Sequence, residues 1–139
     1  MDRAEGAATQ MAVPDIGQRR ARELYAAATG PDGRRFELAP EVALNLAAAC
    51  DKLIEDLRKA AADGDQLTGV TGFPELPSGQ ALAKGFGAKG REFLDTVTAF
   101  QEAALLFKAA YLAAGQRLSE ADAANRAALQ LISDYLEPR

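Results

Sequence analysis

The sequence contains no histidine and no tryptophan, and its only cysteine is Cys50. Without histidine, neither a Ser-His-Asp nor a Cys-His nucleophile system can form, and imidazole metal ligands are missing. A single cysteine cannot form a disulfide within the chain. We therefore expect a protein that is not an enzyme and holds no metal or cofactor, with Cys50 as a small core residue in the middle of a helix.

Long apolar runs and an excess of positive charge are also missing. No run approaches the roughly 18 apolar residues of a membrane span. The formal net charge is -4, whereas nucleic-acid binding needs a concentrated positive field. The first residues do not show the basic segment and apolar segment of a cleaved signal peptide. We expect no nucleic acid, membrane span or small-molecule substrate, and a location that is cytoplasmic or secreted without a cleaved signal.

Alanine-rich apolar sequence takes the place of these features. Apolar residues make up 48% of the 139-residue chain. Alanine favours helix and lets helices pack closely, although it buries little area per residue. The length suits one small domain, and no strand-like alternation is present. The composition predicts an all-α fold.

The strongest helical pattern occupies residues 91–136, where Gly115 is the only glycine and proline is absent. At alternating steps of four and three residues the pattern is apolar or aromatic except at Asn125. This average repeat of 3.5 residues keeps one face of a helix against a partner helix. The expected partner contacts are Phe93, Phe100, Phe107, Tyr111, Leu118 and Ile132.

Two alternatives stay open for this pattern. The aromatic residues Phe93, Phe100, Phe107 and Tyr111 are suited first to a core, and the alternative is a groove or surface for a partner protein. Asn125 either fixes the register between two chains or lies at a solvated edge of the helix.

Two further helices are expected before this stretch. Asp15 is suited to cap a short helix over about 15–28, and turn residues follow it at 30–33. Pro40 is suited to the first position of a helix over about 40–62. The apolar positions of that second helix are Val42, Leu46, Ala49, Leu53, Leu57 and Ala60. Residues 1–14 are small and polar, and we expect disorder there.

The expected architecture is a long antiparallel helical hairpin, with 40–62 against 79–136 and the short N-terminal helix packed on it, in one domain over 15–139. The lengths do not match, because a continuous helix over 91–136 would be about 70 Å long, roughly twice the length of 40–62. Three arrangements would resolve this. The long helix bends near Gly115, with a new cap at Ser119, or the N-terminal helix covers the remainder, or a second chain does.

One motif typical of nucleotide binding is present. Gly85-Phe86-Gly87-Ala88-Lys89-Gly90 matches G-x-G-x-x-G. The chemistry of that motif needs a preceding strand and a helix N-terminus directed at the pyrophosphate. An alanine-rich helical stretch precedes it here, so we interpret these glycines as packing or hinge residues.

Three segments within about residues 36–129 resemble a known family. They are Phe36-Glu37-Leu38-Ala39-Pro40-Glu41, Gly72-Phe73-Pro74-Glu75-Leu76-Pro77-Ser78-Gly79, and Tyr111-Leu112-Ala113-Ala114-Gly115 followed by Asp122-Ala123-Ala124-Asn125. With two helices around a glycine-rich connection, they look like the ESAT-6/WXG100-like superfamily of actinobacterial type VII secretion, in particular its EspC-like branch.

The resemblance implies a WXG100-like hairpin that acts by coiled-coil pairing with a helical protein partner or with a second copy of itself. The family's Tyr-x-x-x-Asp/Glu secretion signal is missing, because Tyr25, Tyr111 and Tyr135 are followed at that spacing by Thr29, Gly115 and Arg139. We expect a non-enzymatic, secretion-associated protein that is exported with a partner. The alternative is a cytoplasmic adaptor or chaperone for a larger secreted effector.

Overall fold

The computed structural model describes residues 13–31, 35–65, 72 and 75–137. These residues form four α-helices, α2 (Gln18–Thr29), α3 (Pro40–Asp65), α4 (Pro77–Ala114) and α5 (Leu118–Leu136), and no strand. The expected all-α class is confirmed for this part of the chain. Residues 1–12, most of the stretch for which we expect disorder, lie outside the described residues.

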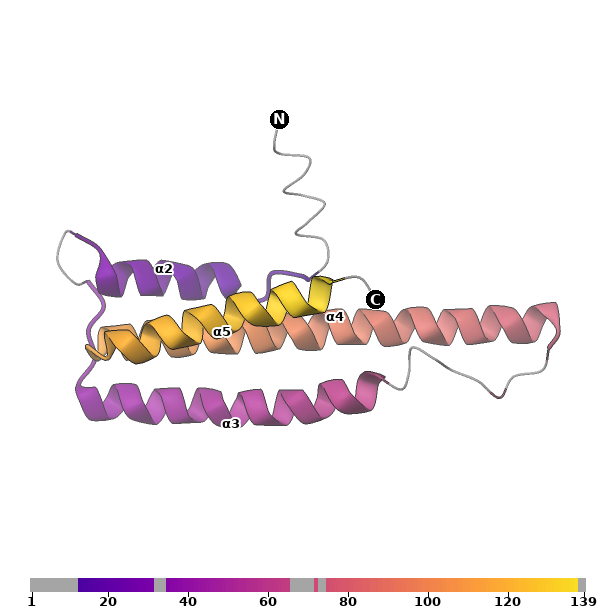
Figure 1. Cartoon of the computed structure of the whole chain (residues 1–139), viewed down its shortest axis with the longest axis horizontal. Helices are drawn as coiled ribbons and strands as arrows, with labels where there is room; N and C mark the ends of the chain where they lie inside the picture. Colours follow the sequence, from indigo (N-terminus) through magenta and orange to yellow (C-terminus); the bar gives the residue numbers. More distant parts are fainter. Residues whose placement is uncertain (1–12, 32–34, 66–71, 73–74, 138–139) are drawn as a thin grey trace, which may run out of the picture.

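The long helix α4 is the centre of the fold. Helices α2, α3 and α5 each pack on α4 and not on one another. In Figure 1, α2 lies above α4, α3 below it and α5 in front of it. Helices α3 and α5 run antiparallel to α4, whereas α2 runs parallel to it. A fourth side of α4, behind it in this view, has no described helix against it.

The range 79–136, expected as one long helix, is two helices. The chain turns between Ala114 and Leu118, and α5 returns along α4 (Figure 1). The break comes near Gly115, as in the first of the three arrangements considered. The fold therefore differs from a two-helix hairpin, because the expected second helix folds back on itself.

Two backbone hydrogen bonds close the end of α4. The N–H of Gln116 donates to Ala113 O at 3.0 Å, and the N–H of Arg117 donates to Leu112 O at 2.8 Å. This is the Schellman pattern, in which the residue after the cap takes a left-handed conformation. That residue is Gln116, with a φ of 70°, and not a glycine. The expected cap at Ser119 is wrong, because α5 begins at Leu118 without a side-chain cap.

Two other helix ends also differ from the expected bounds. Helix α3 continues past residue 62 to Asp65. Its buried Gly64 lies under the ring of Phe93, where a Cβ would overlap the ring. Helix α2 begins at Gln18, and Asp15 accepts a hydrogen bond from the N–H of Arg19 at 3.0 Å. The N-cap of α2 is Gly17 and not Asp15, so the expected cap at Asp15 is wrong, although its carboxylate bonds to a backbone N–H in the first turn.

The core is built mainly from alanine. Among the described residues, Leu112 is the only large side chain that is fully buried, with an exposed fraction of 2%. It packs with Ala28 of α2, Ala47 of α3 and Ala121 of α5, so one cluster joins all four helices. Small side chains allow the helices to approach α4 closely.

The buried face of α3 is not the expected one. It consists of Ala43, Ala47, Cys50 and Ile54. The expected positions are half-buried or exposed, with Val42 at 43% and Leu53 at 46% exposure. The face expected from the large apolar residues is therefore one position away from the face that packs on α4. Alanine at 43 and 47 is what lets α3 approach α4.

Candidate interaction surfaces

Phenylalanines recur along α4 at every seventh residue. They are Phe86, Phe93, Phe100 and Phe107. Because seven residues make almost two helical turns, the four rings lie close to one line along the helix. Phe86, Phe93 and Phe100 are 55%, 41% and 45% exposed, and Phe107 is half-buried. The line therefore faces largely outward from the bundle.

This line lies on the side of α4 between α2 and α3. Phe107 contacts Gly17, immediately before α2, where a Cβ would lie 3.3 Å from the ring. Phe93 contacts Gly64 in the last turn of α3. By contrast, Leu105 and Lys108 line a groove between α3 and α5. The phenylalanines thus occupy the side of α4 that α5 does not cover.

Helix α3 contributes leucines to the same side. Asp51, Glu55 and Arg58 mark the flank of α3 that faces α5, because they line the groove with α5 residues. The 3.6-residue helical repeat places Leu46 and Leu53 on the opposite flank. We define the α3–α4 face as Val42, Leu46, Leu53 and Leu57 of α3 with Phe93 and Phe100 of α4.

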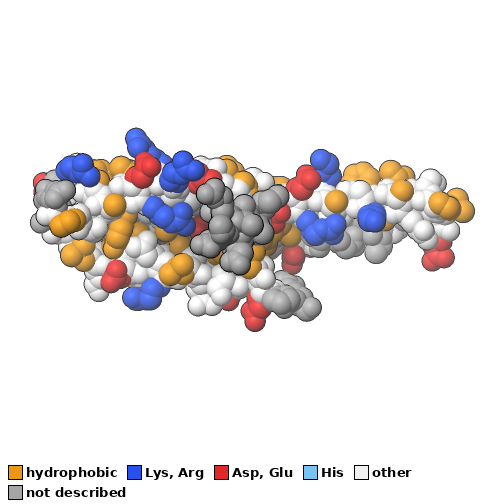
Figure 2. All heavy atoms as spheres, turned by 90° about the horizontal axis from the view of Figure 1, so that it is seen from above, with side chains coloured by type: hydrophobic (Ala, Val, Ile, Leu, Met, Phe, Trp, Pro, Cys, Tyr) orange, Lys and Arg blue, Asp and Glu red, His pale blue; other side chains and the backbone are white. Residues whose placement is uncertain are grey.

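Helix α4 projects beyond the rest of the bundle (Figure 1). It has 38 residues, or about 57 Å, whereas α3 has 26 residues, or about 39 Å. We call residues 77–92 the projecting segment. Leu82 and Phe86 on it are 52% and 55% exposed. Figure 2 shows hydrophobic side chains on this part of the molecule beside lysine and arginine side chains.

The nucleotide-like motif at residues 85–90 lies inside the projecting segment. It is continuous α-helix, with no strand before it and no loop. Its backbone N–H groups belong to a helix interior and are not directed at a phosphate site. Gly87 and Gly90 are buried, as packing glycines would be, whereas a Cβ at Gly85 would meet open space.

The expected contact residues divide between two helices. Phe93 and Phe100 lie on the α3–α4 face. Phe107 and Tyr111 continue the same side of α4, with ring centroids 6.0 Å apart, and Phe36 packs edge-on against Tyr111 at 6.4 Å. Leu118, 52% exposed, and Ile132, half-buried, lie on α5. The break near Gly115 separates these last two from the aromatic line.

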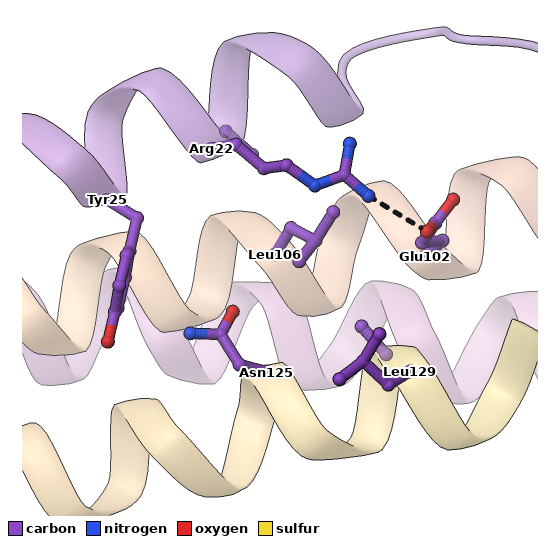
Figure 3. Close-up of a pocket in the computed structure, with 8 residues that line it drawn as sticks. Arg22, Tyr25, Glu102, Leu106, Asn125 and Leu129 are labelled. Carbon is purple, nitrogen blue, oxygen red and sulfur yellow. Dashed lines mark hydrogen bonds and ion pairs between the residues drawn. The ribbon is translucent and has the colours of Figure 1, made fainter. Parts of the chain in front are cut away.

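A second groove runs between α2 and α5 over α4 (Figure 3). It encloses about 340 Å³, with Tyr25 of α2, Leu106 of α4 and Leu129 of α5 among its lining residues. Asn125 points into it from α5 and is half-buried (Figure 3). Asn125 therefore lies at an open groove of this chain.

A polar cluster that the sequence pattern does not indicate closes one end of that groove. The Glu102 carboxylate accepts a hydrogen bond from Gln18 Nε2 at 3.1 Å. It also pairs with Arg22 Nη2 at 3.2 Å (Figure 3). Gln18 is only 4% exposed. Gln18 and Arg22 lie 84 and 80 positions before Glu102, so no local motif signals this cluster. The cluster fixes α2 on α4.

Cys50 is buried on the α4-facing side of α3, as expected. Burial, followed by the nearby Asp51 carboxylate, raises the pKa of its thiol to about 11, against a smaller opposing effect of Lys108. The thiolate is the reactive form of cysteine.

We expect Cys50 to resist alkylation at pH 7.5 in the folded protein, because both burial and the raised pKa suppress the thiolate. Mass spectrometry after iodoacetamide treatment should show modification only once urea has unfolded the chain. Rapid modification under native conditions would contradict the packing described for α3.

Tyr135 links the last turn of α5 to α4 through a side-chain hydrogen bond. Its hydroxyl donates a hydrogen bond to the Asp95 carboxylate. Burial, followed by the hydrogen bond and the charge of Asp95, raises the pKa of Tyr135 to about 12. An unfolded tyrosine has a pKa near 10. The folded state therefore holds this proton over a pH range in which the unfolded state releases it.

This difference predicts a loss of stability between about pH 10 and 12, with the contribution of Tyr135 fully present below pH 10. Tyr135→Phe and Asp95→Asn should both reduce the slope of the free energy of unfolding against pH in this window. Urea unfolding at several alkaline pH values measures it. Tyr111, whose pKa burial also raises, accounts for a remaining slope. An unchanged slope in both variants would contradict the prediction.

The described part of the chain holds neither a cluster suited to a metal ion nor a helix suited to cross a membrane. No group of three acidic or cysteine side chains there is arranged to hold a metal ion. None of its helices combines the length and the apolar character that crossing a bilayer requires.

No protein-family model, curated protein or solved structure matches this chain. The likeness to type VII secretion proteins therefore rests on the three sequence segments alone.

Proposed function

We propose that this protein is a non-enzymatic helix-pairing protein of type VII secretion, which binds a helical partner through its α3–α4 face. The observation that carries the proposal is the exposure of large apolar side chains on that face, at 46% for Leu53, 41% for Phe93 and 45% for Phe100. Contiguous apolar surface of this kind is characteristic of protein interaction sites.

The extent of the face supports pairing with a helix. A phenylalanine buries about 150–250 Å² when fully covered, so each half-exposed ring leaves roughly 80 Å² for a partner. Phe93 and Phe100 together leave roughly 160 Å², and the leucines and Val42 of α3 extend this apolar surface along the face. The seven-residue spacing of the rings suits the packing of one helix on another.

The secretion context is supported by the three family-like segments. The missing Tyr-x-x-x-Asp/Glu signal favours export together with a partner that carries the signal.

Secretion is tested with an antibody to the untagged protein in an actinobacterial host, with and without its type VII ATPase. The proposal expects the protein in culture filtrate only when the ATPase is present. A cytoplasmic marker in the same fractions controls for lysis. Protein confined to the lysate of both strains would overturn export.

The second candidate is a cytoplasmic adaptor or chaperone for a larger effector, and the missing secretion signal is the observation that favours it. In that case the protein stays in the lysate and associates there with a secreted client. The client's level in the filtrate should then fall when this protein is deleted.

The role of the face is tested separately by Phe100→Asp. Phe100 is the better probe, because Phe107 also contacts Gly17 and Tyr111 inside the fold. We expect Phe100→Asp to remain helical and to lose partner association in cross-linked cells. Leu129→Asp, at a 72% exposed position on α5, is the matched control and should associate normally. Equal association by both variants would exclude the face.

A further inference from the structure

We propose that α2 is a displaceable cover over an apolar seam of α4, and that the helical partner takes the place of α2 on this seam. We define the seam as Ala103, Leu106, Ala110 and Ala113, which follow one another at steps of three and four residues. The inference rests on the proposed function for its partner, whereas the release of α2 is tested without a partner.

The seam is buried beneath α2. Its four side chains are between 0% and 7% exposed. Ala21 of α2 packs with Leu106, and Ala28 of α2 belongs to the same core cluster as Ala113. Side chains at this spacing form one line that a second helix can cover. Helix α2 therefore occupies a helix-binding surface of α4.

Helix α2 contributes little apolar area to this contact. Its fully buried apolar residues are two alanines, Ala21 and Ala28, which lie seven positions apart. The larger Leu24 and Tyr25 are only half-buried. Because hydrophobic stabilisation scales with the apolar area buried, these side chains hold α2 weakly. Neither α3 nor α5 adds a contact that would hold α2 in place.

The rest of the attachment is polar. Both carboxylate oxygens of Glu102 bond to α2, Oε1 to Gln18 and Oε2 to Arg22 (Figure 3). Water satisfies the same groups when α2 leaves, so these bonds add little net stability to the docked helix. A paired buried charge is better suited to specify one arrangement than to stabilise it. The anchor thus fits a contact that is specific and reversible.

The seam adjoins the α3–α4 face. Gly17, immediately before α2, lies against both Ala103 of the seam and Phe107 in the line of phenylalanines. Release of α2 would join the seam and the exposed ring of Phe100 in one apolar surface. A partner helix on this surface would contact the seam as well as the exposed rings. While it is docked, α2 excludes the partner from the seam and is therefore autoinhibitory.

The contacts of α2 specify the chemistry of the helix that replaces it. Small residues seven positions apart are required in the places of Ala21 and Ala28, because only small side chains allow so close an approach to α4. An arginine, lysine or glutamine is required beside the first of them, because the Glu102 carboxylate would otherwise be buried without a donor. The partner is thus a helix that reproduces the small residues and the donor of α2.

Release of α2 is tested by alkylation of Ala103→Cys in a Cys50→Ala background. Ala103 is 6% exposed beneath α2, and Ala47→Cys, at a 5% exposed position on α3, is the matched control. We expect Ala103→Cys to react with iodoacetamide at least about tenfold faster than the control under native conditions. Equal rates would show that α2 leaves no more readily than α3, and would overturn the inference.

Occupation of the seam is tested with a fluorescently labelled peptide of residues 13–31 and the full chain. Gln18→Ala with Arg22→Ala in the full chain removes the anchor from α2 and leaves the seam unchanged. Because the peptide competes with α2, its affinity should be at least about tenfold higher for this variant than for the wild type. A peptide with Ala21→Asp and Ala28→Asp is the control and should not bind. Equal binding of the two peptides to the variant would overturn the inference.

Displacement by the partner is tested in cross-linked cells with the same double variant. We expect Gln18→Ala with Arg22→Ala to increase partner association at least about threefold over the wild type, because α2 no longer competes for the seam. Arg22→Ala alone, which keeps the buried Gln18, should give a smaller increase. Tyr135→Phe weakens the attachment of α5 instead and should give none. Association that is unchanged or reduced in both α2 variants would overturn the displacement.

Failure of this inference differs from failure of the proposed function. If the α2 variants do not increase association while Phe100→Asp still abolishes it, the α3–α4 face binds the partner and α2 does not regulate the binding. If Phe100→Asp and Leu129→Asp associate equally, the face itself is excluded.

Discussion

A Gly115→Ala variant should be less stable than the wild type by about 2–3 kcal/mol. Gly115 is buried at the end of α4, and a Cβ there would overlap the Cβ of Ala43 in the first turns of α3. Ala43 is 0% exposed. Both atoms are fixed to backbone, so no side-chain rotation relieves the overlap, and α3 has to move away from α4. Urea unfolding followed by circular dichroism measures the change.

The same substitution at Gly85 is a matched control in the same helix. A Cβ at Gly85 meets no atom within 4 Å, so Gly85→Ala should raise stability by up to about 1 kcal/mol through helix propensity. Adding Ala43→Gly to Gly115→Ala should recover part of the loss, because it removes the other overlapping atom. A Gly115→Ala variant as stable as wild type would refute the close contact between α3 and α4.

Leu112→Ala should have the largest effect of any truncation in the core, a loss of about 3–4 kcal/mol. Leu112 is 2% exposed, and its neighbours in the core cluster are mainly alanines, from α2, α3 and α5 as well as from α4. Alanine side chains are too short to fill the cavity. Because small domains have only about 5–15 kcal/mol of stability, a large part of the total would be lost.

Leu129→Ala is the control for Leu112→Ala. Leu129 is 72% exposed, so its truncation should change stability by no more than about 0.5 kcal/mol. Urea denaturation gives the free energy of unfolding of each variant. The two losses are comparable if that free energy falls with urea concentration at the same slope in both variants. Similar losses at the two positions would show that Leu112 is not the centre of the core.

The helical class and the start of α3 follow from local sequence, because caps and turns act over a few residues. Pro40 begins α3, as expected, whereas α2 begins after Gly17 and without the expected cap at Asp15. The buried face of α3 does not follow from local sequence. Leucine carries more apolar area than alanine, so pattern analysis chooses Leu46 and Leu53 as core, whereas close packing on α4 requires Ala43 and Ala47.

The turn between α4 and α5 shows the same limit. A glycine near a helix end suggests a left-handed residue, yet Gln116 adopts that conformation and Gly115 does not. Gly115 is required by its contact with Ala43, which lies 72 positions earlier in the chain. No pattern in the neighbourhood of Gly115 carries that information.

The candidate face was predictable in part. The seven-residue spacing that places Phe93 and Phe100 together is a local property of α4. The prediction of one surface that also includes Leu118 and Ile132 required an unbroken helix, and the turn at Gly115 and Gln116 removes that condition. The Glu102 cluster with Gln18 and Arg22 depends on how α2 docks, which is a tertiary property.

The arrangement of three helices around α4 has a consequence for local unfolding. Because α2, α3 and α5 contact α4 and not one another, each can detach while the other two interfaces stay intact. Amide hydrogen exchange should therefore be slowest in the bundle half of α4 and should proceed in the other helices as separate units. The shortest of them, α2 with 12 residues, would open first and expose Ala21 and Leu106. The native ensemble would then include a three-helix state in which α4 is open on two sides.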